Sequence, residues 1–361
     1  MSTVEADVCV VGAGPAGALF AGLMAKAGVP VALVGPHNGV PHAPLQSLAP
    51  AARRLLVDEG VDLVGAWAEV PVEVRWPGTG AVPIGPTDHN DINDGGGAPG
   101  ATSVIVDRVQ FDAALRAWAA LQGVRLVTAK VAPRPVACEG VVEVSAGATT
   151  VRARRVTNAA GAHSVFAAPR RATGPRLFGL RASAPTTAPI AGLWVEATPS
   201  GWIWAASTGD GMAAIMTTHH EPPPRSQAHS ALVEQLAASA ALGTVVDPTT
   251  IDGSAISPLD LTPSLADTQP GVLAIGDAAV TIDPIAGQGL AVALRSAAQA
   301  ADWLVAGERP THSPTDVAAT HRQVAVRYYA AAADHLATPF WLARARTAAD
   351  TSTSFERPTR I

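Results

Sequence analysis

The chain has 361 residues, of which 48% are hydrophobic and 15% are charged, and its formal net charge is -5. This composition excludes a disordered or polyelectrolyte chain and predicts a globular protein, built as one large domain or as two tightly joined ones. The basic residues are scattered singly or in pairs, so we expect no nucleic-acid partner.

The sequence carries no signal for a membrane or for an oxidising compartment. Cys9 and Cys138 fall in strand-like runs, with neither a neighbouring thiol nor a metal-type spacing. No apolar run approaches the length of a membrane span, and the first residues lack a basic leader region. We therefore expect a cytoplasmic protein with no membrane partner.

The first predicted unit is a βαβ unit over residues 7–35, DVCVVGAGPAGALFAGLMAKAGVPVALVG. Between its first strand and its helix, Gly12 permits a tight turn, Gly14 lets the backbone approach a diphosphate, and Gly17 lets the helix pack closely on the strand. The N-terminus of the helix then points at the phosphates. The pattern predicts a dinucleotide site, and the alternative is a helix whose glycines serve packing only.

A helix, a long loop and a second helix follow in the sequence. The segment SLAPAARRLLVDEG predicts a helix from Ser47, and residues 76–101 hold so many turn formers that we expect a mobile loop. The segment VDRVQFDAALRAWAALQG has apolar residues at helical spacing. Residues 124–218 are rich in short strand-like pieces, and the chain after Gly287 has a largely helical pattern.

These elements predict an α/β fold: a Rossmann-like nucleotide-binding domain with an inserted antiparallel β-sheet and a helical C-terminus. We expect the substrate to bind between the nucleotide domain and the sheet. The predicted segments are 1–75, 102–170 and 251–305 for the discontinuous nucleotide-binding domain, 76–101 for the loop, 171–250 for the substrate-domain sheet and 306–361 for the C-terminal helices.

A second glycine motif, GDAAVTIDPIAGQGL at residues 276–290, follows the apolar strand GVLAIGD. Asp277 can accept hydrogen bonds from hydroxyl groups such as those of a ribityl chain. The amides around Gly287 to Gly289, at a helix start, can face an electron-rich ring edge. The two glycine motifs are therefore predicted to form two halves of one site, and the alternative is a strand, a loop and a helix without a ligand.

Three segments, GAGPAG, VDRVQFDAAL and GDAA…DPIAGQGLAVALRSA, together resemble the superfamily of FAD-dependent aromatic hydroxylases and halogenases, over most of the chain. Three more, LQSLAPAARRLL, TPSGWIWAAS and YYAAAADHLATPFW, resemble a smaller group of flavoproteins that modify tryptophan residues while maturing quinone-cofactor amine oxidases. The resemblance implies FAD as the cofactor and a Rossmann-like FAD-binding domain. It also implies Arg108 near the flavin, Asp277 on the ribityl chain, and Pro284, Gly287, Gln288 and Gly289 along the isoalloxazine.

The sequence departs from that resemblance at three positions where a carboxylate is common. The second strand ends in Gly35 instead of an acid that holds the adenosine ribose, and His37 or Asn38 is a neutral substitute. Gln46 and Asn158 replace acids in the same way. Since one such hydrogen bond contributes about 1 kcal/mol, these changes predict weaker FAD binding, or a paralogue without catalysis.

Aromatic residues are the candidates for the substrate side. On a strand, Trp202 and Trp204 project from one face and Ile203 from the other, so the two indoles can form a wall against an aromatic substrate. The alternative is an ordinary core position. The pairs Tyr328–Tyr329 and Phe340–Trp341 are expected either to dock C-terminal helices or to border the substrate entrance.

Pro284, Asp283 and Gln46 are the catalytic candidates, because they lie in the motifs that the resemblance places at the flavin. Gln46 cannot titrate, so no general base is assigned. His219 and His220 point to opposite faces of a strand, and DHNDINDGGG departs from a calcium loop, so we expect no metal.

The expected function is an FAD-dependent monooxygenase that hydroxylates an indole or another aromatic group, free or in a peptide, through a flavin hydroperoxide. A separate flavin reductase or NAD(P)H would supply the electrons. The alternatives are a flavin-dependent reductase or dehydrogenase of carbon-carbon double bonds, a flavin halogenase, and a non-catalytic paralogue. Halogenases depend on a lysine between the second strand and the mid-chain helix, and this sequence has no lysine from residue 27 to 129, between Lys26 and Lys130, which disfavours a halogenase unless Lys130 can reach the cavity.

Overall fold

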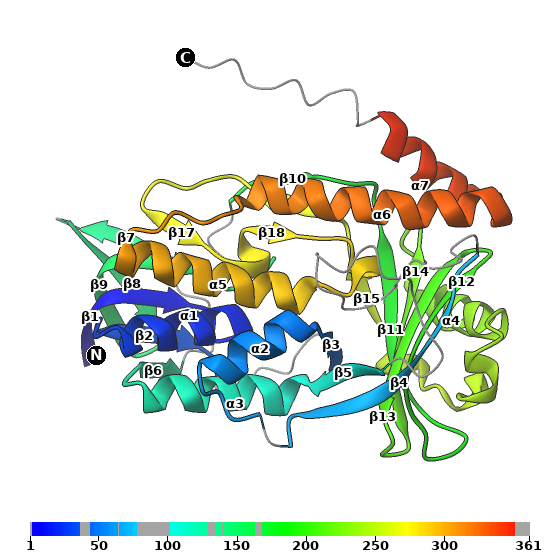
Figure 1. The fold of residues 1–361 in the computed structure, drawn as a ribbon, viewed down its shortest axis with the longest axis horizontal. Coiled ribbons are helices and arrows are strands. Elements are labelled where there is room, and N and C mark those ends of the chain that lie inside the picture. Colours follow the sequence, from blue (N-terminus) through cyan, green and yellow to red (C-terminus); the bar gives the residue numbers. More distant parts are fainter. Residues whose placement is uncertain are drawn as a thin grey trace.

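A seven-stranded sheet and an eight-stranded sheet lie at opposite ends of the molecule in the computed structural model (Figure 1). The structure describes residues 2–36, 44–63, 65–77, 102–128, 135–138, 140–162 and 168–350, and only the backbone of 135–138 and 347–350. The α/β fold predicted from the sequence is confirmed, including its helical C-terminus. His37, Asn38, Lys130 and almost all of the predicted 76–101 loop lie outside the described residues.

The seven-stranded sheet has the order β6-β2-β1-β9-β8-β7, and β17 also pairs with β9. Its β6, β2, β1, β9 and β17 run parallel, whereas β8 and β7 form an antiparallel extension. β2 and the last part of β1 are continuous apolar runs, as expected for parallel strands that are buried on both faces. The strands are β1 (Ser2–Val11), β2 (Val31–Gly35), β6 (Arg125–Thr128), β7 (Pro135–Cys138), β8 (Val141–Ala146), β9 (Thr149–Asn158) and β17 (Val272–Ala274).

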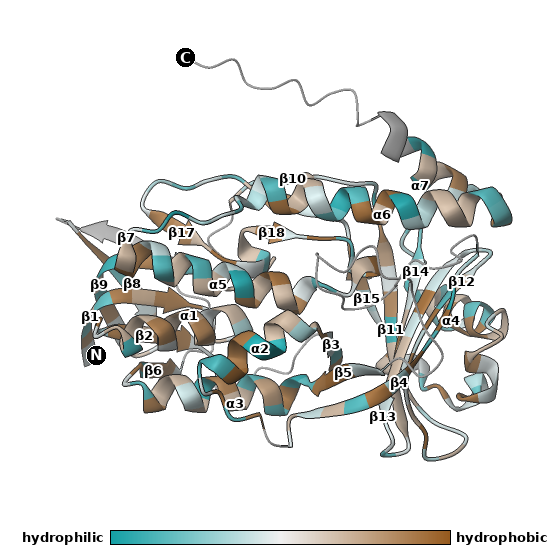
Figure 2. Ribbon diagram, viewed as in Figure 1, coloured by the Kyte–Doolittle hydropathy of each residue, from teal (hydrophilic) through white to brown (hydrophobic). Residues whose placement is uncertain are grey.

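Helices cover one face of this sheet (Figure 1). They are α1 (Pro15–Lys26), α3 (Arg108–Leu121) and α5 (Gly289–Ala306), with α2 (Pro50–Asp58) beside α5. Helix α1 lies between the other two and is brown along most of its length in Figure 2, because it is apolar on nearly every side. A helix of this kind is stable only when it is enclosed, so α1 is central to the core.

The eight-stranded sheet has the order β15-β11-β14-β13-β12-β4-β5-β3. Four of its strands, β11 to β14, come from the predicted 171–250 segment, and the other four, β3, β4, β5 and β15, come from outside it. The strands are β3 (Leu45–Leu48), β4 (Trp67–Arg75), β5 (Thr102–Asp107), β11 (Phe178–Pro185), β12 (Ala191–Thr198), β13 (Gly201–Thr208), β14 (Met212–His219) and β15 (Ser257–Asp260).

The remaining elements join the two ends of the molecule. The long helix α6 (Pro314–Leu336) runs along one side of the molecule and is followed by α7 (Pro339–Asp350) (Figure 1). Helix α4 (Ala228–Ala237) packs on β13 of the eight-stranded sheet. A small sheet contains β10 (Arg170–Ala172), β16 (Ser264–Ala266) and β18 (Val280–Thr281), and short 3-10 helices are η1 (Arg225–Gln227), η2 (Leu242–Thr244), η3 (Pro248–Thr250), η4 (Gly253–Ala255), η5 (Gly276–Ala278) and η6 (Pro284–Ala286).

None of the described helices combines the length and the apolar character that crossing a bilayer requires.

The close contact between α1 and α3 gives a test of the core. A methyl group on Gly22 would lie 2.1 Å from the buried ring of Trp118. Overpacking costs about 1–3 kcal/mol, and a clash this close with a buried ring belongs in the upper part of that range, about 2–3 kcal/mol, of which the gain in helix propensity offsets roughly 1 kcal/mol. We expect Gly22→Ala to lower the free energy of unfolding by about 1–2 kcal/mol in a urea titration. Gly243→Ala is the control because nothing lies within 4 Å of its added methyl group; equal stability of the two variants would contradict this packing.

Candidate functional site

The turn between β1 and α1 is shaped by glycines that no other residue can replace. Gly12 has a φ of +112°, and a methyl group there would lie 2.3 Å from the carbonyl oxygen of Ala159. A methyl group on Gly17 would lie 1.8 Å from the carbonyl oxygen of Gly12. By contrast, a methyl group on Gly14 would meet nothing within 4 Å, so this backbone faces open space at the start of α1. The geometry fits an anion such as a diphosphate in front of the helix N-terminus.

The second glycine motif lies against the first. A methyl group on Gly276 would lie 3.0 Å from the Ala16 side chain of α1. The Gly276 N–H donates to the Ser296 hydroxyl of α5 at 2.8 Å, and the Ile275 N–H donates to the Asn158 carbonyl at the end of β9 at 3.0 Å. The prediction that two distant segments of the sequence meet is therefore confirmed.

Asp277 lies where these segments meet, and its charge is balanced by two arginines. Its surface is exposed, yet enough protein surrounds the carboxyl that burial raises its pKa. An exposed side chain with a pKa raised by burial is expected where a carboxylate faces a recess in the protein and not its outer surface. Arg108 of α3 and Arg170 of β10 act in the opposite direction and lower the pKa. Within the described part of the chain Asp277 accepts no hydrogen bond, so its oxygens can accept from ligand hydroxyls.

Arg108 is held in place by Gln46 and by an acid that the sequence analysis missed. Its Nη1 donates to Oε1 of Gln46 at 2.6 Å, while its Nε and Nη2 donate to the two carboxylate oxygens of Asp112 at 2.9 and 3.0 Å. Asp112 is four residues further along α3, a spacing that could have identified it. Asp112 already balances the positive charge of Arg108, so a neutral Gln46 fits beside it. The catalytic role of Gln46 stays a prediction.

Arg170 is a second cation that the sequence analysis missed. Its Nε donates to the Ser264 hydroxyl at 3.0 Å and its Nη1 to the Ala278 carbonyl at 3.2 Å. Burial lowers the pKa of this guanidinium, whereas Asp277 raises it. The sequence around Arg170 and Arg171 does not predict this contact, because it arises only when β10 pairs with the distant strand β16.

The missing acid at Gly35 has a steric cause. A methyl group on Gly35 would lie 2.6 Å from the Ala13 methyl group and 2.8 Å from the Ala13 backbone nitrogen. Any larger residue at the end of β2 would therefore collide with the glycine turn. Asn158, the other departure, is buried at the end of β9, and its Oδ1 accepts from the Ala160 N–H at 3.2 Å.

The turn before α5 has the form that an anion-facing helix start requires. Asp283 caps the 3-10 helix η6 through a 3.0 Å hydrogen bond from the Ile285 N–H, and Gly287 has a φ of +61°. The buried Gln288 then precedes Gly289, where α5 begins. No side chain of the described residues caps this helix start, so its amides can face a ligand. The roles of Pro284, Gly287, Gln288 and Gly289 toward a flavin stay predictions.

Asp283 belongs to a buried polar cluster. The Tyr329 hydroxyl donates to its two carboxylate oxygens at 3.0 and 2.8 Å, and Nε1 of Trp202 donates to the Tyr329 oxygen at 3.4 Å. Burial raises the pKa of Asp283, and the Arg344 guanidinium acts against this. Arg344 is fully buried and lies 5.0 Å from the centre of the Tyr329 ring. Tyr329 and Arg344 come from α6 and α7, so no local pattern connects them to Asp283.

The predicted orientation of the two strand tryptophans is confirmed. Trp202 and Trp204 both pack on the side of the sheet that faces α6 and α7, and Ile203 packs on the other side. Trp202 is only 1% exposed and Trp204 is half-buried. Trp202 is therefore a core residue in this conformation, and a substrate-binding role for either residue stays a prediction.

The C-terminal aromatic residues dock their helices on the eight-stranded sheet. The ring centres of Trp76 and Trp341 lie 5.3 Å apart, and those of Tyr329 and Trp341 lie 6.0 Å apart. The indole of Trp341 donates to the Thr198 carbonyl of β12 at 2.8 Å, and Tyr328 and Phe340 are buried in the same cluster. This aromatic cluster therefore begins directly beside Asp283, through Tyr329.

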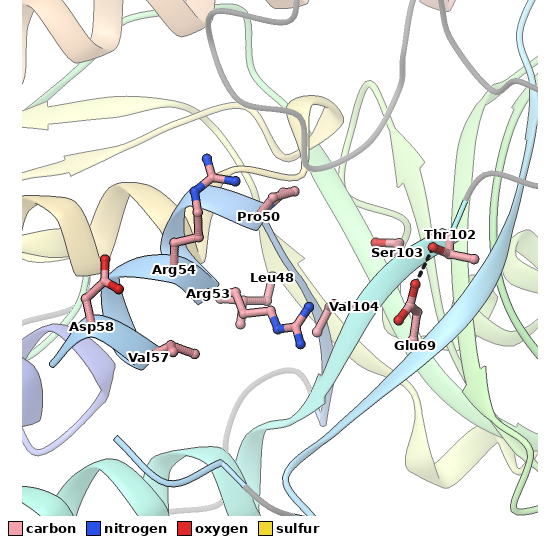
Figure 3. Close-up of a pocket in the computed structure, with 10 residues that line it drawn as sticks. All are labelled: Leu48, Pro50, Arg53, Arg54, Val57, Asp58, Glu69, Thr102, Ser103 and Val104. Atoms are coloured by element: carbon pink, nitrogen blue, oxygen red, sulfur yellow. Dashed lines mark hydrogen bonds between the residues drawn. The ribbon is translucent and has the colours of Figure 1, made fainter. Parts of the chain in front are cut away.

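A hollow of about 400 Å³ lies between α2 and the β3–β5–β4 part of the sheet. Figure 3 shows Arg53 directed toward Val104, Arg54 directed away from it, and Glu69 hydrogen-bonded to Thr102. The Arg53 guanidinium lies 4.5 Å from the centre of the Trp67 ring. The charges in this hollow are mixed, and it does not contain the residues predicted for the flavin.

The histidines considered as metal ligands do not form a centre. Oγ1 of Thr217 and Nε2 of His219 share a 3.0 Å hydrogen bond, and burial lowers the pKa of His219 to about 4. Across the described ranges, no cluster of three or more histidine, cysteine or acidic residues is placed to hold a metal ion.

Comparison with known proteins supports the fold. A family model described as lycopene cyclase protein matches residues 7–181. No curated protein matches the chain in sequence. Among solved structures, a peptidyl tryptophan dihydroxylase essential for tryptophylquinone cofactor biogenesis superposes with a TM-score of 0.76 at 22% identity, over 95% of this chain and 79% of that chain.

Two other similar structures have different activities. The myxobacterial chondrochloren halogenase, an FAD-dependent enzyme, has a TM-score of 0.70 at 19% identity, over 94% of this chain and 86% of that chain. A geranylgeranyl bacteriochlorophyll reductase-like protein from Thermoplasma acidophilum has a TM-score of 0.64 at 19% identity, over 96% of this chain and 91% of that chain. At these identities the likeness concerns the fold, and the resemblance to aromatic hydroxylases and halogenases is confirmed at that level.

The Asp283–Tyr329 contact can be tested by stability. Tyr329→Phe removes the hydroxyl donor from a buried carboxylate, and we expect the free energy of unfolding to fall by about 1–3 kcal/mol near neutral pH. The pKa of Asp283 is already raised, and losing this donor raises it further, so the folded state binds the proton more readily than the unfolded state. Part of the loss should therefore be recovered as the pH falls.

The measurement is urea unfolding at about pH 8 and about pH 5, compared with the wild-type protein at each pH. Tyr328→Phe is the matched control on the neighbouring residue of α6. A loss in Tyr329→Phe that grows on acidification would contradict the assignment.

Proposed function

We propose that the protein is an FAD-dependent monooxygenase that hydroxylates an indole or another aromatic group, in a small molecule or in a peptide. The observation that carries this proposal is the meeting of the Gly12–Gly17 turn, Asp277 and the start of α5. The fold-level likeness to a peptidyl tryptophan dihydroxylase supports the choice of an aromatic, peptide-borne substrate.

The residues present fit FAD. The open backbone at Gly14 would hold its diphosphate, Asp277 its ribityl hydroxyls, and the uncapped start of α5 the electron-rich edge of its ring. Arg108 is fixed by Asp112 and Gln46 close enough to Asp277 to affect its pKa. Bound FAD would supply the activation of oxygen and its delivery to a ring carbon, with electrons from NAD(P)H or a separate reductase.

The chain's own residues would then exclude water and fix the turn beside the ring. The cluster of Trp76, Trp202, Tyr328 and Trp341 is apolar and closely packed, so it excludes water from the side of the turn where Asp283 lies. The Asp283 carboxylate, held by Tyr329, keeps the turn from Pro284 to Gly287 in position. This arrangement makes Asp283 a positioning residue and Tyr329 its support.

A halogenase is less well supported by the residues that the structure describes. Lys26 is half exposed on the surface, and its Nζ lies 2.8 Å from the Glu59 carboxylate. The other lysine, Lys130, lies outside the described residues. Halogenation, and reduction of a carbon-carbon double bond, are therefore kept as alternative outcomes of the activity test.

Binding of FAD is tested by one substitution that the fold tolerates. Gly14 has an ordinary φ of -78° and open space around its added methyl group, so Gly14→Val should fold normally but occupy the place of the diphosphate. We expect the wild-type protein to take up FAD at micromolar concentration, with the visible spectrum of bound flavin, and Gly14→Val to bind it at least about a hundredfold more weakly.

Gly243→Val is the matched control, since it also has open space and lies far from α1 in the sequence. Absence of FAD binding by the wild-type protein would overturn the proposed function. Equal binding by wild type and Gly14→Val would overturn the placement of the diphosphate.

The reaction is tested with the FAD-loaded protein, a flavin reductase, NADH and oxygen, using indole, a phenol and a tryptophan-containing peptide as substrates. We expect a product heavier by one or two oxygen atoms that requires oxygen and does not require halide. A product that requires chloride or bromide would indicate a halogenase. Saturation of a double bond in the absence of oxygen would indicate a reductase.

A further inference from the structure

A second, larger hollow lies along the outer side of α5. It is open to solvent on one side, has a volume of about 1230 Å³, and is lined by α5, the segment before α6, the first turns of α6, α2 and the end of β17. It is distinct from the Gly12–Gly17 turn, although the two share one segment. Residues 275–280 contribute Asp277 to the site described above, and Ile275, Ala279 and Val280 to this hollow.

The ionisable side chains that line the hollow are all basic. Its described lining includes Arg54, Arg295, Arg309, His312 and His321 and no carboxylate, although acids outnumber bases in the chain as a whole. Arg295 is half-buried on α5, and Arg54 of α2 lines both this hollow and the smaller one. Three guanidinium groups around one space favour a ligand with several negative charges.

The nearby acids are engaged mainly elsewhere. Asp302 lies among other acids, and its pKa is raised by burial and by Glu308 and Glu59. Asp316 accepts from the Ser313 hydroxyl at 2.7 Å in the cap of α6, which lowers its pKa, and it lies close enough to His312 that this imidazole lowers the pKa further. His312 is therefore partly balanced by a carboxylate, whereas the described lining around Arg295 and Arg309 contains none.

The same wall carries a ring and hydrogen-bonding groups. Trp303 of α5 is 42% exposed, which is unusual for an indole, and it lines the hollow one turn after Gln299. The Gln299 amide donates to the Thr311 hydroxyl at 2.8 Å, which ties the segment before α6 to α5. An exposed indole next to arginines is suited to stack on a heterocyclic base whose phosphates bind the guanidinium groups.

We propose that this hollow binds a ligand that contains a nucleoside diphosphate, with its phosphates on Arg295 and Arg309 and its base on Trp303. The volume exceeds that of typical small-molecule pockets, so a mononucleotide or a dinucleotide fits within it. The site does not depend on the proposed FAD site, because it uses other residues.

The test is calorimetric titration of the FAD-saturated protein with ADP, with NADPH and with inorganic pyrophosphate. Saturation with FAD keeps ADP out of the first diphosphate site. If the wild-type protein takes up no FAD, the same titrations are made on Gly14→Val, in which that site is filled by a side chain. Failure of the proposed function and failure of this inference are thereby distinguished.

We expect one ADP per chain, bound more weakly as salt is added, with affinity reduced roughly tenfold or more in Arg295→Gln and in Arg309→Gln. Trp303→Leu should weaken ADP roughly two- to tenfold and leave pyrophosphate unchanged. The control is Arg225→Gln, an exposed arginine next to α4 that is not part of the hollow. Thermal unfolding of each variant checks that the fold is retained.

Tighter binding of NADPH than of ADP would identify a dinucleotide as the occupant, and equal binding would identify the shared nucleoside diphosphate as sufficient. No heat with any of the three probes, or unchanged ADP affinity in both arginine variants, would overturn the proposal. Pyrophosphate that binds as tightly as ADP would overturn the base contact with Trp303.

Discussion

The structure depends on the close approach of two backbones at positions where no side chain fits. Gly12 and Gly17 let β1 turn directly into α1, and Gly276 lets the end of β17 come within contact distance of Ala16. Because the central strands are parallel, their carboxyl ends lie at one edge of the sheet, and both motifs follow such ends. The meeting of the two motifs is therefore a product of backbone geometry, and side chains only complete it.

The segment from Gly276 to Gly287 carries an exposed carboxylate near one end and a buried carboxylate toward the other. Arg108 and Arg170 come from α3 and β10 and oppose the desolvation of Asp277. Further along the same segment, Asp283 is enclosed by Tyr329 and Arg344, and the aromatic cluster begins. The chain thus passes from the exposed, charged Asp277 to the buried Asp283 beside the aromatic cluster within a few residues. This gradient suits a cofactor with a phosphate end and a ring end.

The parts of the candidate site whose geometry could be predicted from the sequence are those built from neighbouring residues of the chain. Gly12, Gly14, Gly17 and Asp277 lie in motifs whose spacing has a mechanical cause, and the α/β fold followed from the alternation of apolar strands and helices. The partners that arrive from distant elements could not be predicted in this way. Tyr329 reaches Asp283 across 46 residues, and only the packing of α6 brings them together.

The full extent of the eight-stranded sheet could not be predicted from the sequence pattern either. β3, β4 and β5 precede the predicted insertion in the chain, and only their pairing with each other and with β12 shows that they continue the same sheet. Gly35 appeared as a lost acid, whereas its contact with Ala13 assigns it a packing role. That contact also limits what can be built at this turn: an aspartate or glutamate at position 35 would collide with the Ala13 methyl group and backbone nitrogen, so an acid at the end of β2 requires a wider glycine turn as well.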